Sequence, residues 1–200
     1  MTRPNTVNPP RLAPPGAGVP AIERIVGGLI LSVHRCLGTP ASMSSRFERE
    51  RGAIAALCAG RNDATLSSRV LIPRLRGLED SSRFWSVYMT LDHLRIVNDA
   101  IDRAIGDLVQ NRMPDGTAST AAVKPSDRVG SEVVAAYESS CDTLATMLAA
   151  GVDFRTTLRY AHPWFGPLDA AGWSALSAIH MGIHRVQIKR ILRDGTRGGA

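Results

Sequence analysis

Apolar residues recur every three or four positions along most of this 200-residue sequence. That spacing places them on one face of an α-helix, whereas a half-buried strand would alternate apolar and polar residues. In the first such stretch, residues 21–37, the apolar positions are Ile22, Ile25, Val26, Leu29, Ile30, Val33 and Leu37. The one short run with strand character, residues 70–72, is followed by Pro73. The sequence therefore predicts an all-α fold.

Four further helices are predicted, at residues 45–59, 82–110, 131–150 and 169–193. Gly60 ends the first of these, and Asp169 is the predicted N-cap of the last. Helices of this length that follow one another around a single core are typical of an up-down four-helix bundle. We therefore expect such a bundle, preceded by an extra N-terminal helix at residues 21–37.

The first twenty residues differ in composition from the rest of the chain. They contain six of the twelve prolines, together with Gly16 and Gly18. Such a segment cannot build a helix and has little to bury, so we expect a disordered Pro-rich tail over residues 1–20. The hydrophobic fraction of 44% is sufficient for a core, and the length fits one domain. Residues 21–195 are therefore expected to form a single helical domain.

Hydropathy, cysteine content and charge limit the cell compartment and the partners that are expected for this chain. No apolar run approaches the ~20 residues of a membrane helix, and the start of the chain lacks a secretory signal pattern. The three cysteines form no CxxC pair, which is typical of reduced thiols in a cytoplasmic protein. The net charge of +6 comes mainly from arginines scattered along the chain rather than clustered on one face. A membrane is therefore not an expected partner, and nucleic-acid binding stays a minor alternative.

Three histidines are predicted to point into the bundle. On a helical wheel of residues 169–193, His180 and His184 lie about 40° apart in the middle of the apolar face. His93 occupies the centre of the apolar face of residues 82–110. Three imidazoles are hard to satisfy in one apolar interior, since each ring has two nitrogens that need partners. A divalent cation resolves this, because each neutral ring donates one lone pair and its N–H finds another acceptor.

The His-x-x-x-His spacing alone is a weak motif, and a set of unrelated core histidines is the alternative. The inward orientation of the pair and the presence of His93 on another helix favour a metal site. Gln187 is a candidate for a contact with a ligand histidine or with substrate. Tyr137 and Cys141, one turn apart on residues 131–150, are candidates for lining the pocket, and their alternative role is core packing.

Three protein ligands leave coordination positions open, which is typical of catalytic rather than structural metal sites. A cation there can lower the pKa of bound water toward ~7, polarise a carbonyl or hold a thiolate. We expect zinc or nickel foremost, although imidazole also suits iron and manganese. No general base is evident beside the histidines, because Asp92 points about 100° away from His93.

Two sequence blocks resemble the DinB/YfiT-like superfamily of metal-binding proteins. One is residues 83–94, with Trp-Ser at 85–86 and His-Leu at 93–94, and the other runs from residue 162 to residue 184. The resemblance covers most of residues 45–193. It implies an up-down four-helix bundle with a long crossover and a divalent metal held by His93, His180 and His184. Known activities in the family include metal-dependent thiol transferases and isomerases, and many members have none assigned.

These observations predict a metal-dependent transferase or hydrolase that acts on a thiol-linked or small electrophilic substrate. Its expected partners are a small molecule or a thiol, and a homodimer is the commonest assembly for such a chain. The alternative is a non-catalytic interaction bundle in which the metal is structural or absent.

Overall fold

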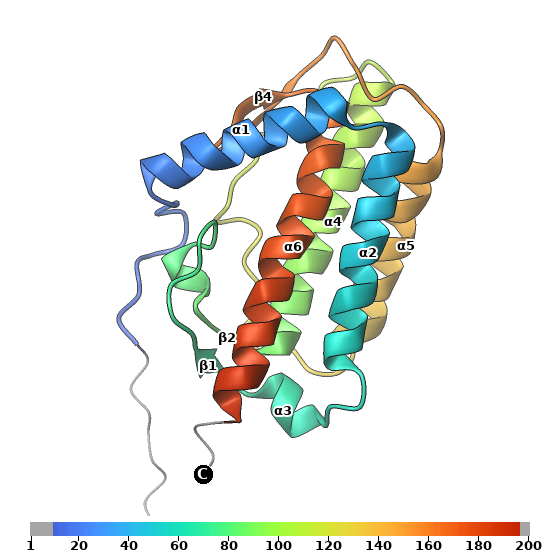
Figure 1. The fold of residues 1–200 in the computed structure, drawn as a ribbon. Helices are drawn as coiled ribbons and strands as arrows, with labels where there is room; N and C mark the ends of the chain where they lie inside the picture. The colour runs from blue at the N-terminus through green and yellow to red at the C-terminus, as the bar shows by residue number, and fades with distance from the viewer. Residues whose placement is uncertain (1–9, 197–200) are drawn as a thin grey trace, which may run out of the picture.

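The structure is a computed structural model, and it describes residues 10–196. Its helices are α1 (Ala21–Leu37), α2 (Pro40–Cys58), α3 (Asp63–Ser67), α4 (Val87–Val109), α5 (Val133–Ala149) and α6 (Ala170–Gly195), with a 3-10 turn at Asp80–Ser82. Helices α2, α4, α5 and α6 run side by side, and each packs against two of the others. Helix α1 lies across one end of this group (Figure 1). The predicted all-α four-helix bundle with an extra N-terminal helix is therefore confirmed.

Helix α2 begins five residues earlier than the sequence pattern predicts. The hydroxyl of Thr39 accepts a hydrogen bond from the backbone N–H of Ser42, and the Ser42 hydroxyl accepts one from the backbone N–H of Thr39. This capping box is followed by Pro40 at the first helical position, where the missing N–H costs nothing. Local capping thus starts the helix before the first residues of its apolar pattern.

Helix α4 begins later than predicted, because the residues before it form a short strand. Strand β2 (Phe84–Trp85) pairs antiparallel with β1 (Val70–Leu71). Ser86 then caps the helix, with its hydroxyl accepting the N–H of Met89 at 3.1 Å. A second antiparallel pair, β3 (Tyr160–His162) and β4 (Gly166–Leu168), lies directly before α6. The two strand pairs thus position the first residues of α4 and α6, the helices that carry the candidate ligands.

The core between the four bundle helices is built from large aliphatic and aromatic side chains. Its most buried members, each less than 2% exposed, include Phe47, Ile54, Ile101, Ile105, Leu108, Leu144 and Leu148. Helix α6 is the most enclosed element, since it contacts α1, α2 and α4. Within residues 10–196, no helix has both the length and the apolar character needed to cross a membrane.

The N-terminal segment differs from the disordered tail predicted for residues 1–20. Residues 1–9 lie outside the described part of the chain, but residues 10–20 pack against the bundle. The backbone N–H of Ala13 donates to Asp80, and those of Gly16 and Gly18 donate to Glu79. Residues 10–20 have no regular structure but are held in place because Glu79 and Asp80 accept hydrogen bonds from their backbone. The composition of the segment does not predict such contacts.

Candidate metal centre

The three predicted ligand histidines meet at one point between α4 and α6. The Nε2 atom of His180 lies 3.1 Å from the Nε2 of His93 and 3.1 Å from the Nε2 of His184. One ligand atom from each ring can be chosen so that all three lie within 4.8 Å of one another. Two helices separated by 60 residues therefore bring three imidazoles together as the helical wheels predict.

Two of the rings are oriented by hydrogen bonds on their other nitrogen. His93 Nδ1 lies 2.6 Å from the carbonyl oxygen of Val123, which can only accept, so this nitrogen carries the proton. His184 Nδ1 lies 2.6 Å from Oε1 of Gln187, whose Nε2 donates to the carbonyl of Ser82 at 2.7 Å. Each ring consequently presents an unprotonated Nε2 to the shared point.

In this arrangement the Nε2 atoms of His93 and His184 are both hydrogen-bond acceptors, and only His180 Nε2 can place a proton between them. A protonated Nε2 on His180 can serve the other two rings only by sharing one hydrogen between them. Its Nδ1 is buried and has no hydrogen-bond partner among the described residues. A divalent cation would accept all three Nε2 lone pairs, and the carbonyl of Val123 and the amide of Gln187 are typical outer partners of metal-ligating histidines. The residues present therefore fit a divalent metal ion.

Burial keeps the cluster neutral. His93 is 6% exposed and His184 is 4% exposed. The buried indole of Trp85 lies with its ring centroid 5.2 Å from His93 and stacks on His184 at 6.3 Å. Loss of water lowers the pKa of His93 to about 4, and it lowers those of His180 and His184 well below their ordinary value. Neutral imidazole is the form that binds a metal.

The histidines line a cavity of about 540 Å³. Its other walls are largely apolar, with side chains from α1, α4, α6 and the β3–β4 hairpin, among them Leu31, Val97, Phe165, Trp173, Leu176 and Ile183. The crossover between α4 and α5 contributes residues 117–120 and 122–124. A cavity of this size and polarity is typical of small-molecule sites, where a few polar groups orient an apolar ligand.

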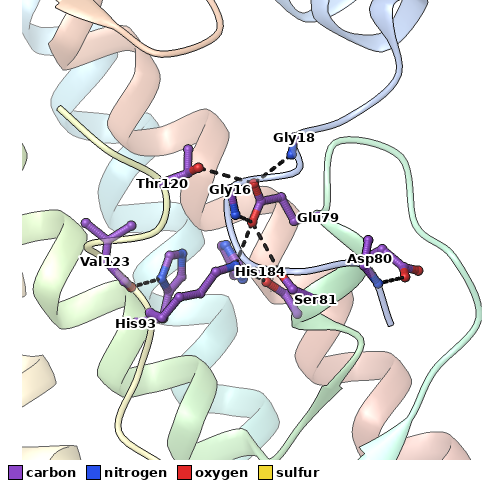
Figure 2. Close-up of polar contacts among 12 residues, drawn as sticks. Gly16, Gly18, Glu79, Asp80, Ser81, His93, Thr120, Val123 and His184 are labelled. Carbon is purple, nitrogen blue, oxygen red and sulfur yellow. Dashed lines mark hydrogen bonds and ion pairs between the residues drawn. The ribbon is translucent and has the colours of Figure 1, made fainter. Parts of the chain in front are cut away.

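A buried carboxylate, Glu79, ties three segments together beside the histidines (Figure 2). It is 5% exposed and accepts hydrogen bonds from the backbone of Gly16 and Gly18, from Thr120 and from Lys124, whose Nζ lies 2.7 Å away. Burial acts to raise the pKa of Glu79, but these bonds and the Lys124 charge bring it below the ordinary value. Glu79 is thus a charged link between the N-terminal segment and the crossover, a role that no sequence pattern predicts.

His162, which lies outside the predicted helices, also lines the cavity. Its Nδ1 accepts the backbone N–H of Trp164 at 3.1 Å, which leaves the proton of the neutral ring on Nε2. Its ring stacks on Phe165 with centroids 4.8 Å apart, and burial lowers its pKa to about 4. The Nε2–H of His162 is therefore a hydrogen-bond donor available to a molecule in the cavity.

The suggestion that Tyr137 and Cys141 line the pocket is corrected by the structure. Both are buried in the core, at 1% and 0% exposure, because α5 packs against α4 and α2 on the side away from the cavity. Tyr137 Oη lies 3.9 Å from the sulfur of Met181, and burial raises the pKa of Cys141 to about 12. Gln187, in contrast, contacts His184, one of the three clustered histidines, through its Oε1.

The metal-free protein is expected to lose stability as the pH falls from 6.5 toward 5. Unfolded histidine takes up a proton near its ordinary pKa of 6.5, whereas His93 and His162 resist protonation in the folded state until about pH 4. Each such histidine lowers the unfolding free energy by about 1.4 kcal/mol per pH unit in this window. Urea titrations between pH 7.5 and 5 measure the slope, and His162→Phe should reduce it. A flat profile over this range would contradict the buried neutral state.

Comparison with known proteins supports the fold. The chain is similar in structure to TT2238, a four-helix bundle protein whose crystal structure is known, with a TM-score of 0.54 and 23% sequence identity. The match covers 76% of this chain and 98% of that chain. No protein-family model and no curated protein matches the sequence significantly.

Proposed function

We propose that this protein binds one divalent metal ion through His93, His180 and His184 and is a DinB-like protein. The observation that carries the proposal is the convergence of three Nε2 atoms, two of them fixed as acceptors by hydrogen bonds on Nδ1. The Trp-Ser and His-Leu positions at 85–86 and 93–94 and the His-x-x-x-His pair on α6 support the DinB-like assignment. Zinc or nickel is the expected metal, since both bind neutral imidazole well.

We further propose a metal-dependent transferase or hydrolase that acts on a small thiol-linked or electrophilic substrate. A divalent ion bound by the three histidines would supply a Lewis acid that polarises a carbonyl or stabilises a thiolate. The chain itself contributes the rest of the site. Apolar walls from α1, α4 and α6 exclude water from the substrate, and the Nε2–H of His162 donates to an oxygen in the cavity.

The bundle does not depend on the proposed metal for its core. Four of the most buried side chains, Ile105, Leu108, Leu144 and Leu148, are not among the residues that line the cavity. Chelation is therefore expected to remove the ion and leave the helices folded, with an unchanged far-ultraviolet circular dichroism spectrum. Melting of the helices on chelation would instead favour the alternative of a structural metal, because its binding energy would then be folding energy.

The direct test is titration of tag-free, metal-stripped protein with Zn²⁺ or Ni²⁺ by calorimetry. We expect one ion per chain. Absence of binding, together with an unchanged melting temperature on adding either metal, would contradict the proposed site. The loaded and stripped proteins are then compared for transfer of a thiol to small electrophiles and for hydrolysis of thioesters, and equal rates would refute the proposed activity while leaving the metal site intact.

Replacing Gln187 is expected to weaken metal binding by about 10–100-fold, which is typical for loss of an outer hydrogen-bond partner. Gln187 is fully buried, and its Oε1 is the acceptor that holds His184 Nδ1–H. Calorimetric titration of Gln187→Leu measures the loss. Gln187→Glu, which keeps the acceptor for His184 but loses the donor to Ser82, should recover part of the affinity. Equal affinities for wild type and Gln187→Leu would show that the amide does not position the ring.

A further inference from the structure

Helix α1 carries its apolar stripe on the outside of the molecule. Seven of its large apolar residues are 46–81% exposed: Ile22, Ile25, Val26, Leu29, Ile30, Val33 and Leu37. Leu31 is the one buried residue of the helix, at 3% exposure. An amphipathic surface helix normally turns its apolar face toward the core. The orientation of α1 is the reverse.

Contacts at both ends of α1 hold it in this orientation. Near its start, Glu23 accepts the backbone N–H of Gly77 at 2.9 Å and pairs with Arg74. Near its end, Arg35 pairs with the buried carboxylate of Asp169, with Nε 2.7 Å from Oδ1. Between them, a Cβ on Gly27 would lie 3.2 Å from the ring of Phe165. Rolling the helix to bury its apolar stripe would break both ion pairs.

The exposed stripe is larger than a monomer ordinarily leaves in water. Taking roughly 180 Å² for each of the seven residues when fully exposed, their exposed fractions correspond to about 750 Å². The largest apolar patch on a typical monomer is about 300–600 Å², and a standard protein interface buries about 800 Å² per partner. The stripe therefore supplies the area that a stable dimer needs.

We propose that a second copy of this chain covers the stripe, with the two α1 helices antiparallel. Six of the seven exposed apolar positions (22, 26, 29, 30, 33 and 37) are spaced by 4, 3, 1, 3 and 4 residues, which is the same spacing from either end. The seventh, Ile25, would face His34 of the other copy. A two-fold axis between Leu29 and Ile30 consequently sets Val26 of one copy against Val33 of the other. Ile22 likewise meets Leu37. The stripe is complementary to itself, as a symmetric dimer interface must be.

The composition of the stripe favours a protein over a membrane surface. Interfacial helices bind anionic lipid through lysine and arginine near their apolar face. Here the residues at one margin of the stripe are Ala21, Ser32 and Cys36, which carry no positive charge, and Arg35 points inward to Asp169. The other margin carries Glu23 and His34, and Arg24 lies on the opposite side of the helix. No lysine or arginine of α1 therefore flanks the stripe, whereas a second stripe matches it in length and polarity.

Sedimentation equilibrium of the full chain tests the proposal. Wild type is expected to be a dimer, and Leu29→Glu is expected to raise the dissociation constant by about 100-fold or more, since it would bury two carboxylates at the axis. The matched control is Val186→Glu, which changes an exposed valine (39% exposed) on α6. A monomeric wild type, or a dimer insensitive to Leu29→Glu with its circular dichroism unchanged, would overturn the proposal. Binding of monomers to anionic vesicles would also overturn it.

Disulfide cross-linking tests the antiparallel arrangement. Leu29→Cys in a Cys36→Ser background places two thiols next to the axis, so oxidation should link the copies. The exposed Cys36 of the wild type should not link them, because antiparallel helices hold the two Cys36 residues about 20 Å apart. Cross-linking through Cys36 but not through position 29 would refute the arrangement.

Discussion

Changing His180 to alanine is expected to abolish metal binding and to leave the bundle folded. This ring is the common neighbour of the other two, with its Nε2 at 3.1 Å from each of theirs. The loss of affinity should exceed the 10–100-fold that is typical of outer-shell changes. Calorimetry measures the affinity, and metal analysis of purified protein measures the occupancy.

The stability of the same variant without metal gives a second test. Its expected result differs from that of replacing a histidine that only packs in the core. In the metal-free protein the His180 ring crowds two acceptor nitrogens and leaves its own Nδ1 without a partner. Metal-free His180→Ala should therefore be at least as stable toward urea as metal-free wild type. The control is His34→Ala on α1, a histidine that contacts Arg46 and lies outside the cluster. Retained metal in His180→Ala, or lost metal in His34→Ala, would refute the assigned ligands.

Replacing Lys124 by methionine is expected to destabilise the protein by about 3–5 kcal/mol, which is the cost of leaving a buried carboxylate without its cation. Glu79 is 5% exposed, and Lys124 Nζ is the positive charge in contact with it. The side chain of Lys124 also donates to Ser81 and Ser82. Urea denaturation at pH 7 measures the change in unfolding free energy.

The double variant Glu79→Gln with Lys124→Met separates the charge from the packing. Removing both charges should recover a large part of the stability, because no unpaired carboxylate stays buried. Lys189→Met, which changes an exposed lysine of α6, should stay within about 0.5 kcal/mol of wild type. Equal losses in the single and double variants would show that Lys124 acts through its packing rather than its charge.

The helical period predicted the elements that are buried on one face, and it placed His93, His180 and His184 on the inner faces of two helices. Orientation on a helix follows from the sequence alone, because successive residues turn by a fixed angle. Whether two helices bring such residues together depends on the bundle, and the DinB-like resemblance supplied that expectation. The structure brings the three rings together.

The surroundings of the site were not predictable in the same way. Val123 and Lys124 lie in a crossover without regular periodicity, and His162 lies in a hairpin whose strands are three residues each. Their positions depend on long-range contacts such as those of Glu79. The same limit explains Tyr137 and Cys141, since an inward position on α5 meets the core and not the cavity. Periodicity tells which face of a helix is apolar but not which neighbour covers it, and on α1 that face lies on the outside.

The cavity has walls of two different origins, and this has a consequence for how such a chain can change. Its histidines stand on two long helices anchored in a dense core, whereas much of the remaining wall comes from the β3–β4 hairpin and the crossover between α4 and α5. Substitutions or length changes in those connecting segments alter the shape offered to a small molecule without moving the imidazoles. Descendants of one ancestral bundle can thus diverge in what they accept while inheriting the same ligand geometry.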